Sequence, residues 1–355
     1  MAGTGDPMKR LVIYFDGTWS LPIIKTNVHR LYEITADADD AGVRQVKEYW
    51  SGVGTRWMEV LRGGLLGFGT DRNICEAYDW LKDRYEDGDQ IFILGFSRGA
   101  YSARSLAGMI ARCGLLQRDA TTTVDQIYRR YAAKNEQLVA DSHRIPIHFL
   151  GVWDTVGALG VPWGNFPGVS RSTTLFHNTN PSSLYENMFQ ALAIDEHRAA
   201  FTPTLWTAGE EDAFVLQPHQ RLEQRWFIGS HTDVGGGLDS DLARITLAWM
   251  WGRANECGLA FTRQIREESE DHRTRIWDSF ATFVLGAYRV ARINRRYYRP
   301  IGQALNETID PSVFRRWQED DSYRQTAKNL GAWAHERGLD PAGIHETIPA
   351  RATIP

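Results

Sequence analysis

The sequence predicts an α/β fold in which a mainly parallel central sheet carries helices on both faces. Two observations predict it: short, continuously apolar runs of strand length, and helix-period segments between them. A strand that is covered on both faces is apolar without alternation, because neither face meets water. Strands that alternate with helices are joined by right-handed crossovers and therefore lie mainly parallel.

Apolar runs that end in a polar or glycine-rich turn predict the strands. There are four of these, with a weaker fifth: Arg10–Asp16, Gln90–Ser97, Ile147–Asp154, Arg225–His231 and, fifth, Val46–Trp50. Parallel strands bring their carboxyl ends to one edge of a sheet, which is where ligands bind in such folds. We therefore expect functional residues in the turns that follow these runs.

Apolar residues at helical spacing predict helices in three places. The three sets are Ile74, Ala77, Tyr78 and Leu81; Leu184, Met188, Ala191 and Leu192; and Leu242, Ile245 and Trp249. The second set predicts a helix over LYENMFQALAI that ends just before Asp195. A further long helix is expected over Trp277–Arg295.

The pattern is typical of one domain over residues 9–330, followed by a tail at 331–355. Two insertions are expected within it, a loop or cap at about 160–182 and a helical C-terminal part at 258–330. The first is rich in Gly, Pro, Asn and Ser, which favour turns. Two prolines near the chain end indicate a loosely held tail.

Composition excludes several function classes. The 355 residues carry a net charge of −4, which argues against wholesale nucleic-acid binding. The three cysteines, Cys75, Cys113 and Cys257, are widely spaced and form no zinc or disulfide pattern. We therefore expect neither a metal nor another cofactor.

The N-terminus lacks the basic and apolar segments of a secretory signal. The longest apolar candidate, Phe280–Val290, is about half of the ~20 residues that a membrane span needs. We expect a protein that is made and folded in the cytosol, with signal-less export left open. The oligomeric state is not predicted.

The pentapeptide Gly95-Phe96-Ser97-Arg98-Gly99 closes the strand QIFIL and precedes a helix-forming segment. A G-x-S-x-G motif at a strand-to-helix turn is the context of a nucleophile elbow. The sharp turn strains the serine backbone and exposes its hydroxyl, and the two flanking glycines let strand and helix pack closely. The sequence thus predicts an α/β-hydrolase-like fold with Ser97 as nucleophile. An ordinary turn with an incidental serine is the alternative.

A serine hydroxyl needs a base to take its proton, and His231 is the best placed of the ten histidines. It ends the run WFIGS and begins a glycine-rich loop, at the same sheet edge as Ser97. It also comes late in the chain, as the Ser-Asp-His order of this fold requires. His148, inside a strand, and His197, near a helix end, are less well placed. A purely structural histidine is the alternative.

Two carboxylates compete to orient His231 and stabilise its protonated form. Asp154 ends the strand IHFLGVW, and Asp195 stands in the segment IDEHR. Alternatively, Asp154 caps a turn and Asp195 pairs with Arg198. The residues alone leave the choice open, and a slight preference for Asp195 rests on the resemblance described below.

The oxyanion hole needs two N–H donors, one of them from the residue after the nucleophile. Arg98 supplies the first, and Gly17 or Thr18, after the strand RLVIYF, supplies the second. Asp16 would organise that loop by accepting hydrogen bonds. Asp233, two residues after His231, is a supporting residue.

A rival interpretation uses carboxylates to hold a metal. In this interpretation Asp16, Asp154 and Asp233 come together at one edge of the sheet, which would suit a metal-dependent phosphoesterase. The segment YFDGT is similar to the motif of haloacid-dehalogenase-type phosphotransferases, but Tyr14 stands where their nucleophilic Asp is required. No ligand spacing supports the metal site.

Seven motifs in order resemble one widespread α/β-hydrolase family. They are LVIYFDGTW, TNV, GFSRGAYSARSLAGMI, FLGVWDTVGALG, ALAIDEHRAAFTPTLW, WFIGSHTDVGGG and NETIDPSVFRRW, which together span roughly residues 9 to 330. The family was long described only as a domain of unknown function, and it includes the phospholipase effectors that bacteria deliver through type VI secretion. The resemblance implies a triad of Ser97, His231 and an Asp, hydrolysis of carboxylic esters of lipids, and a cap over the site.

The expected function is therefore that of a serine esterase or lipase acting on lipid or phospholipid acyl esters through an acyl-enzyme. The alternatives are a non-catalytic binding module and the metal-dependent phosphoesterase. Gly160–Asn180 and Gly63–Gly69 are either a lid and acyl pocket or plain loops. The basic stretch Arg289–Arg299 is either a helix that contacts anionic lipid or a solvated helix end. The natural substrate is not predicted.

Overall fold

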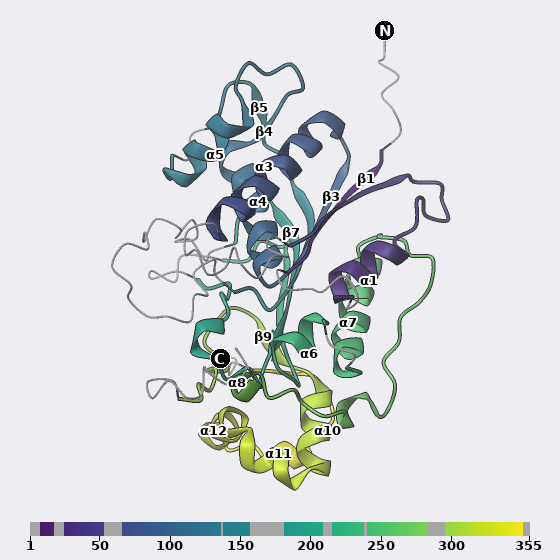
Figure 1. Cartoon of the computed structure of the whole chain (residues 1–355). Helices are drawn as coiled ribbons and strands as arrows, with labels where there is room; N and C mark the ends of the chain where they lie inside the picture. The colour runs from purple at the N-terminus through teal and green to yellow at the C-terminus, as the bar shows by residue number, and fades with distance from the viewer. Residues whose placement is uncertain are drawn as a thin grey trace.

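A computed structural model of the chain describes residues 8–17, 25–52, 66–135, 138–156, 181–208, 215–237, 240–282 and 295–350. In these residues a twisted central sheet is flanked by helices on both faces (Figure 1). The α/β fold with a mainly parallel sheet is confirmed.

The described residues form an eight-stranded sheet with the order β10-β9-β8-β7-β6-β3-β1-β2. All neighbouring pairs are parallel except β10 and β9. The strands are β1 (Arg10–Phe15), β2 (Gln45–Trp50), β3 (Gln90–Phe96), β6 (Ile147–Trp153), β7 (Tyr185–Ala193), β8 (Arg221–Phe227), β9 (Glu307–Ile309) and β10 (Ile348–Pro349). A separate antiparallel pair consists of β4 (Leu115–Leu116) and β5 (Ser142–His143).

The helices divide between the two faces. One face carries α3 (Leu66–Arg84), α4 (Arg98–Cys113) and α5 (Val124–Ala132), and the other carries α1 (Asn27–Ile34) and α7 (Leu242–Glu256) (Figure 1). The C-terminal helices α10 (Pro311–Glu319), α11 (Asp321–Thr326) and α12 (Lys328–Glu336) group beside α6 (His231–Gly235) and α8 (Ser279–Thr282). Short 3-10 turns lie at η2 (Ala199–Phe201), η3 (Asp271–Arg273) and η5 (Pro341–Gly343).

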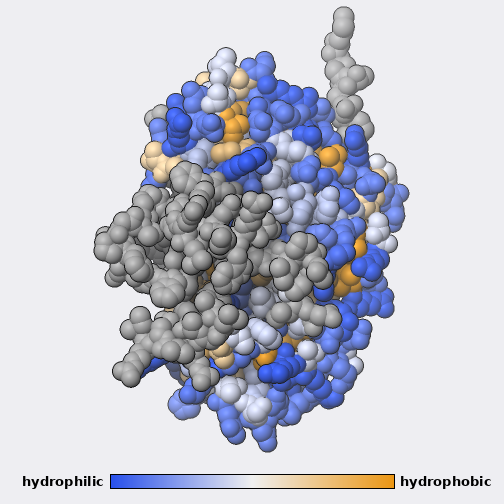
Figure 2. All heavy atoms as spheres, in the orientation of Figure 1, coloured by the Kyte–Doolittle hydropathy of each residue, from blue (hydrophilic) through white to orange (hydrophobic). Residues whose placement is uncertain are grey.

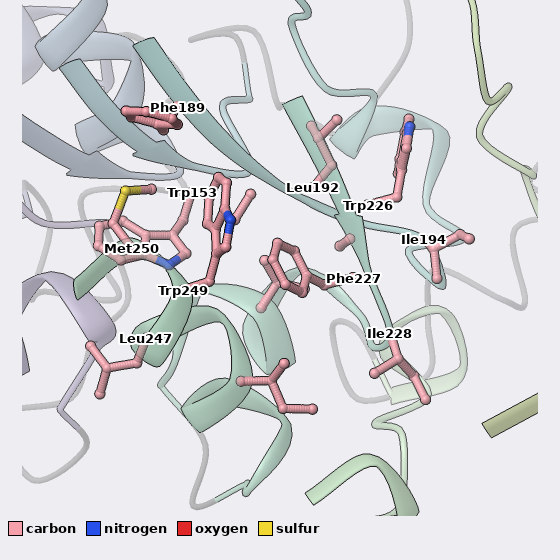
Figure 3. Packing of buried hydrophobic residues seen from close by; sticks show 14 of the residues in the cluster. Trp153, Phe189, Leu192, Ile194, Trp226, Phe227, Ile228, Leu247, Trp249 and Met250 are labelled. Carbon is pink, nitrogen blue, oxygen red and sulfur yellow. The ribbon is translucent and has the colours of Figure 1, made fainter. Parts of the chain in front are cut away.

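Two hydrophobic clusters bury the two faces of the sheet. Successive side chains of β1 point to opposite faces of the sheet. Val12 packs in the cluster with α1 and α7, and Ile13 packs in the cluster with α3 and α4. Trp249 of α7 contacts Phe189 of β7 and Phe227 of β8, with ring centroids 6.0 and 5.3 Å away (Figure 3). Each such side chain contributes about 1.5–3 kcal/mol when fully buried, so the sheet is fixed from both sides.

The strand order creates the edge at which a site can form. From β1 the chain crosses to β2 on one side, whereas β3 lies on the other side of β1. The loops that follow β1 and β3 therefore diverge, and such a switch point at the carboxyl ends of the strands is where ligands bind in open α/β sheets. The ends of β6, β7 and β8 lie along the same edge.

Each of the five predicted runs contains strand residues, although the run Arg225–His231 is a strand only as far as Phe227. The helix predicted before Asp195 is wrong. Residues Tyr185–Ala193 form β7, hydrogen-bonded between β6 and β8. Met188, Ala191 and Leu192 match helical spacing only because both faces of this central strand are buried, so the apolar positions do not alternate. The spacing of these apolar residues fits both a helix and a buried strand, so the spacing alone could not predict which of the two forms.

The C-terminal part also differs from expectation. Residues 331–350 are not loosely held, because Trp333 is buried in the core and β10 pairs with β9. Of the long helix expected over Trp277–Arg295, the described residues contain only the short α8, and Arg295 is not helical. Residues 160–180 lie outside the described part.

The surface of the described residues is mainly hydrophilic on the face shown, with hydrophobic side chains in small separate spots (Figure 2). Large exposed hydrophobic side chains are scattered, as at Leu138, Val215 and Trp277. Within the described ranges, every helix is too short or too polar to cross a bilayer.

Candidate active site

Ser97 stands between β3 and α4 in a backbone conformation that side chains rarely adopt. Its φ is 59° and its ψ is −120°. Such a strained position persists only where the surroundings enforce it, which is the case in a nucleophile elbow. The Ser97 hydroxyl does not cap α4, so its oxygen is directed elsewhere.

Two glycines make the turn sterically possible. A Cβ at Gly99 would overlap the carbonyl oxygen of Phe15 in β1 and lie 2.6 Å from that of Asp16. A Cβ at Gly95 would lie 2.5 Å from the carbonyl oxygen of Gly99. The start of α4 thus packs directly against the ends of β1 and β3, which fixes the position of Ser97.

His231 begins α6, just past the end of β8, and its ring lies against Ser97. Its Nε2 is 2.8 Å from Ser97 Oγ, and its Nδ1 is 2.6 Å from Asp154 Oδ2. A carboxylate only accepts, so Nδ1 carries the proton, and the Ser97 hydroxyl donates to Nε2. The ring is enclosed by Phe96 and Phe201, with centroids at 4.7 and 5.1 Å. The imidazole therefore has one orientation.

Neighbouring elements hold the helix that carries His231. Asp233 accepts hydrogen bonds from the Ser230 N–H and hydroxyl, at 2.9 and 2.8 Å, and so closes the first turn of α6. The Asn27 amide of α1 donates to the carbonyl oxygen of Val234 at 3.1 Å. Asn27 belongs to the TNV motif, which thereby has a structural role next to the site.

Asp154 follows β6 and is fully buried, with a φ of 42°. Besides the contact with His231, its carboxylate accepts the Ala193 N–H at 3.1 Å and two hydrogen bonds from Arg299, at 2.6 and 2.9 Å. Burial alone would raise the pKa of Asp154, but the charge of Arg299 and the hydrogen bond from His231 outweigh it and hold the pKa well below its ordinary value. Asp154 is therefore a fixed anion.

Asp195 lies at the same edge but does not contact His231. It follows β7, and its Oδ2 accepts the Gly229 N–H at 2.8 Å and lies 3.4 Å from the Tyr323 hydroxyl. Burial, with a contribution from Asp233, raises the pKa of Asp195 to about 7. The slight preference for Asp195 as the orienting acid thus has no geometric support, because the contact is made by Asp154.

Glu196 is a further buried carboxylate behind the site. Arg198 donates to it through Nε and Nη2, at 2.8 and 2.7 Å, so Arg198 pairs with Glu196 and not with Asp195. Glu196 also accepts the backbone N–H of His231 at 3.3 Å and the Ser279 hydroxyl at 2.9 Å. Burial alone would raise the pKa of Glu196, but Arg198 outweighs it and lowers the pKa to about 2.

The start of α4 offers N–H groups for an oxyanion. Among the described residues, the backbone N–H of Arg98 has no hydrogen-bond partner, as is usual for the first turn of a helix. The Gly17 N–H donates to Asp16 Oδ1 at 2.6 Å. Asp16 also accepts from the hydroxyl of Thr26 at 2.7 Å and from Tyr49. Thr18 lies outside the described residues.

The three aspartates of the metal interpretation do not form a metal site. Each is bound to its own partners: Asp16 to Thr26, Asp154 to Arg299, and Asp233 to residues of α6. In the ranges that the structure covers, no three His, Cys, Asp or Glu side chains gather in a way that could hold a metal ion.

Arg299 and Glu196 were not predicted from sequence. The pairing of Glu196 with Arg198 could have been predicted, because acidic and basic side chains stand two positions apart in the segment IDEHR. The role of Arg299 could not have been predicted, because this residue ends a basic stretch that the sequence predicts to face lipid or water. The structure corrects this expectation for Arg299, which is fully buried, whereas Arg289 to Asn294 lie outside the described residues.

The hydrogen-bonded chain from Ser97 through His231 to Asp154 can carry out nucleophilic chemistry. The histidine can take the hydroxyl proton, and the buried carboxylate can stabilise the resulting imidazolium. Ser97 is 7% exposed and His231 is 4% exposed, so little water reaches the pair. Low exposure strengthens every charge interaction in the site.

The family model described as "T6SS, Phospholipase effector Tle1-like, catalytic domain" matches residues 9–253. An uncharacterized protein of Saccharomyces cerevisiae is 28% identical over 234 residues, covering 56% of this chain and 33% of the yeast protein. The chain therefore spans about a third of the length of that curated relative.

Solved structures also match, at low similarity. An uncharacterized protein from Pseudomonas aeruginosa has 17% identity and a TM-score of 0.42, covering 80% of this chain and 51% of that one. The Tle1 effector, solved bound to the VgrG spike of the type 6 secretion system, has 19% identity and a TM-score of 0.37, covering 66% of this chain and 52% of that one.

Proposed function

This chain belongs to the Tle1-like family of type VI secretion phospholipase effectors, and from that premise we propose that it is a serine hydrolase of lipid or phospholipid acyl esters. Ser97 is the nucleophile, His231 the base and Asp154 the acid that orients it. One observation carries the proposal: the continuous hydrogen bonds Ser97–His231–Asp154, at 2.8 and 2.6 Å.

Acylation follows from the proton positions. Ser97 Oγ attacks the ester carbonyl as His231 Nε2 takes the hydroxyl proton, and Asp154 stabilises the imidazolium through Nδ1. The oxyanion of the tetrahedral intermediate accepts the N–H of Arg98 at the start of α4. Collapse of the intermediate breaks the ester bond, and His231 returns the proton to the leaving alcohol. The product is an acyl-Ser97.

Deacylation repeats these steps with water. His231 takes a proton from a water molecule, the hydroxide attacks the acyl-Ser97 carbonyl, and the fatty acid leaves as the proton returns to Ser97. The Gly17 N–H would complete the oxyanion hole only if it exchanges its hydrogen bond with Asp16 for one with the substrate oxygen. Arg98 is therefore the oxyanion donor that the present geometry favours.

The proposal is tested with an activity-based probe and with substrates. A fluorophosphonate should label the wild-type protein and leave Ser97→Ala unlabelled, because an activated serine oxygen displaces the fluoride of the probe and becomes phosphonylated. The protein should release fatty acid from phosphatidylcholine or phosphatidylglycerol vesicles and from p-nitrophenyl esters, and EDTA should leave the rates unchanged. A folded wild-type protein that resists the probe and leaves every ester intact would refute the proposal.

The substrate class is read from the same panel. A carboxylesterase of small substrates would favour short p-nitrophenyl esters and ignore vesicles, whereas a phospholipase would release fatty acid from the vesicles. Ser105→Ala is a matched control, because Ser105 is a buried serine of α4 that lies two turns beyond the nucleophile. It should retain labelling and turnover.

A further inference from the structure

We propose that Arg299 is a positioning residue of the active site: it holds Asp154 as an oriented anion and balances its charge against His231. The C-terminal segment 295–300 is then part of the site, although it lies beyond residues 9–253, which the family model matches. This inference rests on the proposed function, and it adds to the triad a fourth group from a distant part of the chain.

Arg299 binds Asp154 through two parallel hydrogen bonds. The side chain is fully buried, and Nη1 and Nη2 donate to the two carboxylate oxygens at 2.6 and 2.9 Å. Paired hydrogen bonds of this kind fix the plane of the carboxylate as well as its position. The same nitrogens donate to the carbonyl oxygens of Ala193 and Phe201, at 2.7 and 2.5 Å. The guanidinium is thereby fixed to β7 and η2.

The backbone around Arg299 is held in place as firmly as its side chain. The Tyr297 N–H donates to the His197 carbonyl at 2.9 Å, and the His197 ring nitrogen Nδ1 lies 3.0 Å from the Tyr297 carbonyl. From α12, the Asn329 amide donates to the carbonyl oxygens of Ile194 and Arg299, at 3.0 and 3.3 Å. The guanidinium therefore cannot leave Asp154 without disturbing two other elements.

The charges around the pair show what Arg299 changes. Asp154 and Glu196 carry the negative charges nearest His231, and Arg299 and Arg198 bind one each. Other titratable groups on the surrounding elements are Arg98, Asp195, His197, Asp233, Asp278 and Arg296, of which Asp278 and Arg296 pair with each other. Without Arg299, the charge of Asp154 would be balanced by a protonated His231 alone.

Loss of the Arg299 charge would change the protonation equilibrium of the His231 imidazole in one direction. An uncompensated carboxylate favours the protonated imidazole, but catalysis needs the neutral one to accept the Ser97 proton. Removing the charge of Arg299 should therefore move the acid limb of the pH–rate profile to higher pH. A substitution that keeps the positive charge but removes the two parallel hydrogen bonds should lower kcat and leave the acid limb of the pH–rate profile unchanged.

Two substitutions separate charge from geometry. Arg299→Met should lower kcat/KM on the order of 10²-fold, as expected for a misplaced catalytic group, and should move the acid limb up by about one pH unit or more. Arg299→Lys should lower kcat with the limb close to that of the wild type. Arg10→Met is the matched control, since Arg10 is a buried arginine paired with Asp39 at 2.7 Å, at the opposite end of β1. It should leave the profile unchanged.

A readout without substrate keeps this inference distinct from the proposed function. The ring carbons of His231 can be followed by NMR against pH in the folded wild type and in each variant. A higher titration midpoint in Arg299→Met than in Arg299→Lys supports the role of Arg299 even if no ester is cleaved. The inference is overturned if folded Arg299→Met shows the wild-type midpoint, or if its loss of activity merely follows the unfolded fraction.

Discussion

At the scale of single residues, the site separates two carboxylates that look alike in sequence. Asp154 and Asp195 each follow a strand at the same sheet edge, but only Asp154 meets the ring of His231. What distinguishes them is the distance to His231, which the local sequence does not encode. Ser97 and His231 could be predicted because a glycine pattern and a strand end mark their positions.

This difference can be tested on activity. Asp154→Asn should lower kcat on the order of 10⁴-fold, because the amide cannot stabilise the imidazolium and favours the wrong tautomer of His231. Asp195→Asn should remain within about tenfold of the wild type, because the amide oxygen can still accept the Gly229 N–H. Steady-state kinetics on one ester with both folded variants measures this. The opposite ranking would assign the acid to Asp195.

The pH dependence of stability tests the buried state of Asp195. Its pKa rises from an ordinary value near 3.8 to about 7 in the folded chain. The folded state thus holds an extra proton between those values, so this group loses its contribution to stability as the pH rises through about 7. Asp195→Asn should therefore unfold at higher urea concentration than the wild type at pH 8.5, by the equivalent of a few kcal/mol. The two proteins should converge near pH 4, and an offset that is equal at both pH values would contradict the assignment.

At the scale of elements, the turn from β3 to α4 depends on the absence of side chains. Gly99→Ala should destabilise the protein by about 1–3 kcal/mol or more, because the new Cβ would overlap the carbonyl oxygen of Phe15. Activity should fall with it, since any shift of α4 displaces Ser97.

Gly252→Ala is the matched control for this prediction. Gly252 lies within α7, and a Cβ there meets nothing within 4 Å. Alanine should stabilise the helix by up to about 1 kcal/mol. Thermal unfolding midpoints of the two variants should therefore shift in opposite directions from the wild type. A Gly99→Ala protein as stable and active as the wild type would show that the turn tolerates a side chain.

Element prediction succeeded where burial and spacing agreed, and failed where they conflicted. The runs that became β1, β3, β6 and β8 are short and apolar, and a turn follows each of them. In β7, Met188 and Leu192 stand four positions apart as in a helix, yet they lie on a strand covered on both faces. Periodicity cannot separate a buried strand from a buried helix when both sides are apolar.

At the scale of the whole molecule, the C-terminal part completes both the core and the sheet. Ile309, Val313, Phe314, Leu330 and Trp333 are at most 2% exposed. At about 1.5–3 kcal/mol each, these five side chains contribute roughly 8–15 kcal/mol, comparable with the entire net stability of a domain. A chain that ends at residue 294 should therefore be insoluble or rapidly cleaved in limited proteolysis.

A chain that ends at Ala350 is the control. It keeps the pairing of β9 with β10 and the hydrogen bond from Trp333 Nε1 to the Ala350 carbonyl, at 2.8 Å. It should resist protease as well as the full chain does. A soluble, protease-resistant chain ending at residue 294 would mean that the α/β unit folds without the C-terminal part.

The sequence indicated the α/β class but not how the chain end is used. Residues 328–336 contain Lys, His and Glu among the apolar residues, and Gly and Pro residues follow, which is typical of a loose tail. Leu330 and Trp333 are nevertheless buried on one side of α12. Such packing depends on contacts with residues far away in sequence, and no local pattern reports them.

The residues that meet at the site are 97, 154, 231 and 299, each from a separate part of the chain. During synthesis the ribosome releases them one after another, and the guanidinium that holds Asp154 emerges last. The full set of contacts Ser97–His231–Asp154–Arg299 can therefore form only after residue 299 has left the ribosome.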